Sequence, residues 1–243
     1  MIHDVLICFY KDFKFYFASR IIYLLLLVYI MMAAAFTFLG TDFYIASSVN
    51  LQQFFKLQPL LFIIIVPALT MRSIADEYRS RTLEVIITQP IARLAFVLGK
   101  FLAAWSVCGI LLLSSCIIWA ILANLLPLDN FWILCCYLSA FLMSGALCAI
   151  SLLAATFFYH ALGAFAAGLG ACFLLNNVNL GWIAGLFTSR SMLAAKIAGS
   201  FSFSHQYGEM ISGQIGLAAL LYFLSLIAAF VWLSGAVLDY KRR

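Results

Sequence analysis

Charged side chains that could do chemistry gather in one unexpected place, the stretch DEYRSRTLEVIITQP at positions 76–90. Three acids and two arginines fall within nine residues there, in a chain that is 66% hydrophobic and only 9% charged. Because a charge is costly to place in apolar surroundings, such a group is either solvated or paired. The stretch therefore needs a structural context that explains it.

A search for catalytic or metal-binding patterns is negative. The LGK at 98–100 lacks the upstream glycine of a phosphate-binding GxxxxGK[ST] loop, so we expect no ATP site in this chain. The three histidines, His3, His160 and His205, are far apart and lack carboxylate partners at metal-ligand spacing. The seven cysteines show no CxxC or Cys/His pattern and are interpreted as small buried apolar residues. We expect neither enzymatic activity nor a cofactor or metal in this chain.

Composition indicates an integral membrane protein. Soluble domains carry about 25% charged residues, and the mean hydropathy here is +1.11. The net charge of +5 is not gathered on a soluble basic module, so nucleic-acid binding is not predicted. A helix needs about 20 apolar residues to cross the hydrocarbon. The sequence predicts an all-α protein of six transmembrane helices at 21–39, 54–71, 101–123, 131–158, 161–178 and 215–238.

The distribution of Lys and Arg predicts the orientation of these spans. With an even number of spans, 11 of the 14 basic residues fall on one side, in the N-terminal segment, the 72–100 connection and the C-terminal tail. Cytoplasmic segments carry an excess of Lys and Arg. Both termini and the 72–100 connection are therefore predicted to be cytoplasmic.

Two further segments are amphipathic rather than spanning. Residues 1–20 mix Lys and Asp with Phe and Tyr, which is typical of a helix lying in the membrane interface. Residues 179–214 are moderately polar and contain Gly and Ser together with Phe, Met and Ile. We expect short extracytoplasmic helices there that dip toward the bilayer before the last span.

The 73–92 part of the connection is predicted to contain a short amphipathic helix. Ser73-x-x-Asp76 resembles a capping box, and Glu77 with Arg81 forms an acid-before-base pair one turn apart. Pro90 sets a break before the third span. The apolar stripe of this helix consists of Leu83, Ile86 and Ile87.

Two interpretations of this helix remain open on pattern alone. It could lie on lipid, or it could dock on a cytoplasmic partner. The three acids argue against lipid, because the inner leaflet is itself negative.

In the fifth span, Gly163, Ala167 and Ala171 recur every four residues, a pattern that permits close helix approach within the bundle or in a dimer.

Residues 54–105 resemble the permeases of type 2 (ABC-2, type V fold) ABC exporters, most closely the gliding-motility (GldF-like) branch. Residues 11–23 look like the first connecting helix of that family, and residues 201–233 resemble its final segment. The residues that stand in matching places of the central pattern are Pro67, Leu69, Thr70, Met71, Arg72, Ala75, Glu77, Thr82, Leu83, Glu84, Thr88, Pro90, Gly99 and Lys100. Arg81 stands where the family has Gly, and Arg20 where it has Pro.

The resemblance implies the transmembrane subunit of an ATP-driven transporter in the bacterial inner membrane. Two permease chains, identical or homologous, would sit on a separate cytoplasmic ATPase dimer that binds ATP and Mg²⁺, and an auxiliary membrane subunit sometimes accompanies them. The implied ATPase-coupling residues are Asp76, Glu77, Arg79, Arg81, Thr82, Leu83, Glu84, Ile86, Ile87 and Pro90. Two alternatives stay open, a haem-export-like permease of cytochrome maturation and a membrane scaffold that recruits a cytoplasmic partner without transporting anything.

Overall fold

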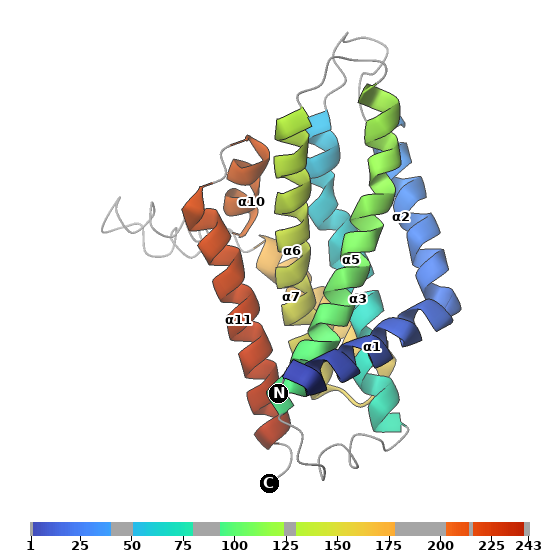
Figure 1. The fold of residues 1–243 in the computed structure, drawn as a ribbon, viewed down its shortest axis with the longest axis vertical. Helices are drawn as coiled ribbons and strands as arrows, with labels where there is room; N and C mark the ends of the chain where they lie inside the picture. Colours follow the sequence, from blue (N-terminus) through green and yellow to red (C-terminus); the bar gives the residue numbers. More distant parts are fainter. Residues whose placement is uncertain are drawn as a thin grey trace.

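The computed structural model describes residues 2–39, 51–79, 93–123, 130–177, 203–213 and 216–240, and every regular element among them is an α-helix. Figure 1 shows the helices as a bundle of long, roughly parallel elements with α1 lying across one end. The predicted all-α class is confirmed for this part of the chain. The helices are α1 (Ile2–Ala18), α2 (Arg20–Leu39), α3 (Leu51–Arg79), α5 (Arg93–Ala123), α6 (Asn130–Phe157), α7 (Ala161–Asn177), α10 (Phe203–Ile211) and α11 (Leu217–Tyr240).

The described helices make this a membrane-embedded protein. Four of them, α3, α5, α6 and α11, are long and apolar enough to cross a bilayer. The pair α1 and α2 bends by 72° and would supply a fifth span if its two members are counted as one. α7, with 17 residues, falls among the shorter apolar helices. The six-span arrangement therefore remains a prediction.

Two predicted boundaries are wrong at the same end of the bundle. α3 continues through Arg79 instead of ending near 71, and α5 begins at Arg93 rather than at 101. Ser73 consequently lies inside α3, so it does not cap a new helix. The charged residues within these extensions lowered the local hydropathy, although the helix itself continues. Residues 73–79 of the 73–92 segment belong to α3, and residues 80–92 lie outside the described part.

α6 is the central helix of the bundle. Its span is 72% buried, and it packs against α3, α5, α7, α10 and α11. Small residues make this close packing possible, as is usual between membrane helices. At Gly145 an added Cβ would lie 2.9 Å from the Trp105 indole of α5. The buried small residues of α6 include Ser139, Ala140, Ser144, Gly145, Ala146, Cys148, Ala149 and Ser151.

α10 lies at the end of the bundle opposite α1 (Figure 1) and is the one short helix described within the 179–214 segment. Tyr207 donates a hydrogen bond to the carbonyl of Phe55 at 2.9 Å, and Trp132 Nε1 donates to the carbonyl of Ile211 at 2.9 Å. On its exposed face His205 Nδ1 lies 3.5 Å from Glu209 Oε1, a carboxylate partner that the sequence analysis did not anticipate. We call the Tyr207 and Trp132 contacts the α10 anchor.

α11 differs from the other spans in its exposure. Only 22% of its span is buried, against 61% to 72% for α3, α5 and α6. Leu217, Leu221 and Trp232 are each more than half exposed. In a membrane protein such an apolar face contacts lipid or another membrane helix.

Candidate functional site

The most unusual side chain in the bundle is Lys100 of α5, which is 1% exposed. Its Nζ lies 3.2 Å from Asp12 Oδ2 and 3.0 Å from Glu77 Oε1. It also donates a hydrogen bond of 2.6 Å to the Ser73 carbonyl. Burial of an ammonium group is strongly unfavourable unless it is paired and hydrogen-bonded. These contacts supply the required partners from two helices, α1 and α3.

Lys11 completes the arrangement from the outer side. Its Nζ lies 3.3 Å from the same Glu77 oxygen that Lys100 contacts, while its side chain stays 60% exposed. Asp12 and Glu77 are only 11% and 10% exposed. With two lysines and two carboxylates, the group has no net formal charge. We call Lys11, Asp12, Glu77 and Lys100 the ion cluster.

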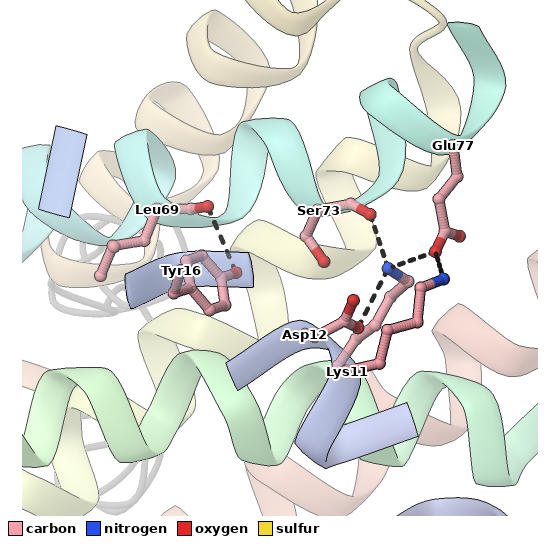
Figure 2. Close-up of polar contacts among 7 residues, drawn as sticks. Lys11, Asp12, Tyr16, Leu69, Ser73 and Glu77 are labelled. Carbon is pink, nitrogen blue, oxygen red and sulfur yellow. Dashed lines mark hydrogen bonds and ion pairs between the residues drawn. The ribbon is translucent and has the colours of Figure 1, made fainter. Parts of the chain in front are cut away.

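The spacing of residues along α1 and α3 aligns the contacts between them. In Figure 2 the Tyr16 contact and the ion cluster lie one after the other along α1 and α3. Tyr16, one turn after Asp12, donates to the Leu69 carbonyl at 3.3 Å. Leu69, Ser73 and Glu77 are spaced by four residues and so lie on one face of α3. Where α1 crosses α3 the contacts follow opposite chain directions, with Tyr16 opposite Leu69 and Lys11 opposite Glu77.

Gly99 lets α1 cross α5 at very short range. A Cβ added at Gly99 would lie 2.6 Å from Cys8 Cβ and 3.1 Å from both Phe9 N and the Val5 carbonyl oxygen. Two of those three atoms belong to the α1 backbone, which cannot move aside as a side chain would. α1 packs more extensively on α5 than on any other described element. The neighbouring residues Gly99 and Lys100 thus both hold α1 on α5: Gly99 permits the close approach, and Lys100 provides the ion pair with Asp12.

The buried side of α1 also changes the acidity of its cysteine. Burial raises the pKa of the Cys8 thiol, and the nearby Asp12 carboxylate raises it further. A thiol in this position stays protonated at neutral pH and reacts slowly, because the thiolate is the nucleophile. Cys8 therefore packs as an apolar side chain rather than acting as a reactive group.

The elbow between α1 and α2 is formed at Ser19. The Ile21 N–H donates to Ser19 Oγ at 3.4 Å, so Ser19 acts as the N-cap of α2. Arg20 then occupies the first position of that helix, where proline is favoured because its missing N–H has no helical partner. Arginine is accommodated there as well, and the elbow forms with Arg20 at this position.

The structure places only part of the predicted coupling set. Glu77 lies in the ion cluster, and the backbone of Asp76 and Arg79 belongs to the last turn of α3. The remaining members lie outside the described residues: Arg81, Thr82, Leu83, Glu84, Ile86, Ile87 and Pro90. Their role as an ATPase-docking helix stays a prediction.

Sequence reasoning missed Asp12 and misplaced Lys100. Lys100 was counted as a charge of a cytoplasmic connection, whereas it lies within α5 and is buried. For Lys100 the sequence contained one indication of burial. A lysine directly after a glycine and at the start of a long apolar run is hard to solvate. The partner Asp12 gave no such signal, because amphipathic helices contain exposed acids as a rule.

The small-residue stripe of α7 lies beside the tightest contact rather than in it. Gly163, Ala167 and Ala171 are half-buried, and the fully buried positions follow one residue later, at Ala164, Gly168 and Cys172. A Cβ added at Gly168 would lie 3.2 Å from Pro67 Cβ of α3 and 3.0 Å from Ser151 Oγ of α6. Gly168 is therefore the residue at which α7 enters between α3 and α6.

The chain matches no protein-family model, and no curated protein sequence is significantly similar to it. Function must therefore be inferred from the residues and their geometry. The ion cluster contains no nucleophile with an activating base. What it can do is electrostatic: it holds α1 to the facing ends of α3 and α5.

Proposed function

We propose that this protein is the permease subunit of an ATP-driven ABC transporter, an exporter in the bacterial inner membrane. The observation that carries the proposal is the position of the buried Lys100. It joins α1 to α3 and α5, the two helices between which residues 80–92 run. A force applied to residues 80–92 by a partner reaches α3 and α5 first, and the ion cluster passes it to α1.

The sequence resemblance supports the same assignment from a different direction. Glu77, Gly99 and Lys100 are among the positions that match the type 2 exporter permeases, and each has a physical reason in this fold. Glu77 and Lys100 pair with each other, and Gly99 admits the α1 backbone. Three of the fourteen matching residues thus attach α1 to the ends of α3 and α5.

The proposed assembly contains two permease chains, identical or homologous, on two copies of a cytoplasmic ATPase, with an auxiliary membrane subunit as a further possible component. ATP and Mg²⁺ would bind in the ATPase. In this assembly the α1 end faces the cytoplasm, both termini are cytoplasmic, and the chain crosses the bilayer six times. Closure of the ATPases would shift the equilibrium between two positions of the 80–92 segment and of the bundle with it.

The test is whether residues 80–92 hold an ATPase. A tagged chain is purified from its native membrane, and the co-purifying proteins and ATP turnover are measured for the parent, Leu83→Asp and Glu84→Arg. We expect the parent to bring down an ATPase and both variants to lose it or to lose its turnover. The matched control is Glu209→Arg, which reverses an exposed carboxylate on α10, at the opposite end of the bundle.

Two outcomes would contradict the proposal, and a third would narrow it to the haem-export alternative, which is also an ABC permease. Normal co-purification and turnover in both 80–92 variants would remove the docking assignment. Capture of a soluble partner without ATPase activity would favour a membrane scaffold. A haem-dependent phenotype with normal export of other substrates would favour the permease of cytochrome maturation.

A further inference from the structure

A shallow groove runs along the elbow between α1 and α2, where α3 packs against both. It is lined by Phe15, Tyr16, Ser19, Ile21, Ile22, Ala68, Leu69 and Arg72. Its enclosed volume is about 20 Å³, room for about one water molecule. A larger ligand would therefore lie along this groove, with most of its length outside the enclosed part.

The groove offers an apolar floor and one charged group. The Tyr16 hydroxyl is already bonded to the Leu69 carbonyl, and Ser19 Oγ already accepts the Ile21 N–H. Arg72 is exposed and is the only charged residue in the lining. A ligand that fits this lining has an apolar part and a negative charge at one end.

The surroundings of the groove are positive. Lys14 and Arg20, which adjoin the lining residues in sequence, are exposed. The carboxylates of Asp12 and Glu77 are buried and paired with lysines. Asp4 lies about 17 Å along α1 from Phe15, the nearest lining residue of that helix, given the rise of about 1.5 Å per residue. The described charges near the groove therefore favour an anion.

The depth of the groove matches one class of anion. The apolar span of α3 ends at Ala75, so Arg72 lies in its last turn, at the level where hydrocarbon meets headgroups. We propose that this groove binds an anionic phospholipid of the leaflet on the α1 side. Its phosphate pairs with Arg72, and the first carbons of one acyl chain lie on Phe15, Ile21 and Ala68, the apolar lining residues that are not buried.

The bound lipid would contact α1, α2 and α3 at once. It would therefore stabilise the 72° bend at the elbow, about two turns of α1 from Asp12 of the ion cluster. The inference does not depend on the proposed transport function, because the groove is formed within this chain.

The test measures lipid binding to the full chain in detergent micelles by native mass spectrometry, without any ATPase. Phosphatidylglycerol is compared with phosphatidylcholine, and inorganic phosphate is added as a separate competitor. We expect phosphatidylglycerol to bind in preference, and Arg72→Gln to weaken it about fivefold, the contribution of one cation at an anionic surface. Lys56→Gln is the matched control, since Lys56 is an exposed cation at the other end of the same helix.

A second pair of variants tests the apolar half of the groove. Ala68→Phe fills it and is expected to lower phosphatidylglycerol occupancy, whereas Ala228→Phe on the exposed face of α11 is expected to leave it unchanged. Equal binding of the two lipids would overturn the proposal. So would equal loss in Arg72→Gln and Lys56→Gln, or full displacement by millimolar inorganic phosphate, which would reveal a simple anion site.

Discussion

The two ends of the bundle are held together by different chemistry. At the α1 end, the ion cluster joins α1, α3 and α5 through charges that are largely buried, with the exception of Lys11. At the opposite end, the α10 anchor joins α10 to α3 and α6 through neutral donors on backbone carbonyls. α3 takes part in both, so one helix is held by ion pairs at one end and by neutral hydrogen bonds at the other.

This difference indicates which end of the bundle can rearrange. In the α10 anchor Tyr207 and Trp132 each donate to a single carbonyl, and the Ile211 carbonyl also accepts from Cys136 Sγ at 3.6 Å. Moving α10 therefore leaves the two donors unpaired. In the ion cluster, Lys100 has three acceptors and Glu77 Oε1 has two lysines. A cluster with shared partners can lose one contact and keep the others. We therefore place the movable end of the proposed permease at α1.

The largest expected effect comes from removing the central cation. Lys100→Met removes the buried cation that pairs with Asp12 and Glu77, and the exposed Lys11 compensates only Glu77. Breaking a buried ion pair in this way costs about 3–5 kcal/mol. We expect a loss of that size in the free energy of unfolding, measured by steric trapping in bicelles. Lys56→Met, which removes an exposed lysine of α3, is expected to leave that free energy unchanged.

A triple variant distinguishes charge imbalance from lost packing. Replacing a whole buried ion cluster is often nearly neutral, whereas breaking it is not. Asp12→Asn, Glu77→Gln and Lys100→Met together should therefore recover part of the stability that Lys100→Met loses alone. If the triple variant were less stable than the single one, the electrostatic explanation of this end would be wrong.

The next effect concerns the helix crossing at Gly99. Gly99→Ala should displace α1 from α5, because the added Cβ meets Cys8 and the α1 backbone at 2.6 and 3.1 Å. Overpacking of this kind costs about 1–3 kcal/mol. Gly170→Ala is the control: no atom lies within 4 Å of its Cβ, so it should be neutral or slightly stabilising. Equal unfolding free energies for the two variants would contradict the close crossing.

The α10 anchor is expected to contribute less per contact than the ion cluster. Tyr207→Phe removes the donor to the Phe55 carbonyl and should cost about 1 kcal/mol. Tyr10→Phe, on an exposed face of α1, should cost nothing measurable. A loss from Tyr207→Phe as large as that from Lys100→Met would erase the contrast between the two ends.

The smallest effect is expected at the outer edge of the ion cluster. Lys11 is 60% exposed, so its pair with Glu77 is screened by water. Lys11→Met should change the free energy of unfolding by at most about 0.5 kcal/mol, and added salt should reduce even that difference. A large and salt-independent loss would show that Lys11 acts as a buried partner.

The sequence predicted the helical class and the membrane location because both follow from composition and the length of apolar runs. α2, α6 and α7 lie within a residue or two of their predicted spans. The extensions of α3 and α5 were not predictable by hydropathy. Glu77 and Lys100 lowered the local hydropathy at these two helix ends. Their burial as paired charges depends on α1, which is distant in sequence.

The candidate site was likewise predicted only in part. Glu77 was predicted as functional because it stands in the charged 76–90 stretch, yet its partners come from α1 and α5. Pairing between residues 12 and 100 leaves no periodic pattern in a single sequence. The same holds for Gly99, whose importance appears only when α1 lies against it. For 80–92, the docking prediction rests on sequence alone.

The central claim is that Lys100 and Asp12 act together to hold α1 on the ends of α3 and α5. A double-mutant cycle of Lys100→Met and Asp12→Asn, read as unfolding free energy in bicelles, tests it most directly. We predict that the double variant loses less unfolding free energy than the two single variants lose together, by about 1 kcal/mol or more. A parallel cycle of Lys100→Met with Tyr207→Phe, at opposite ends of the bundle, should be additive. Additivity of the Lys100 and Asp12 changes within about 0.5 kcal/mol would contradict the account.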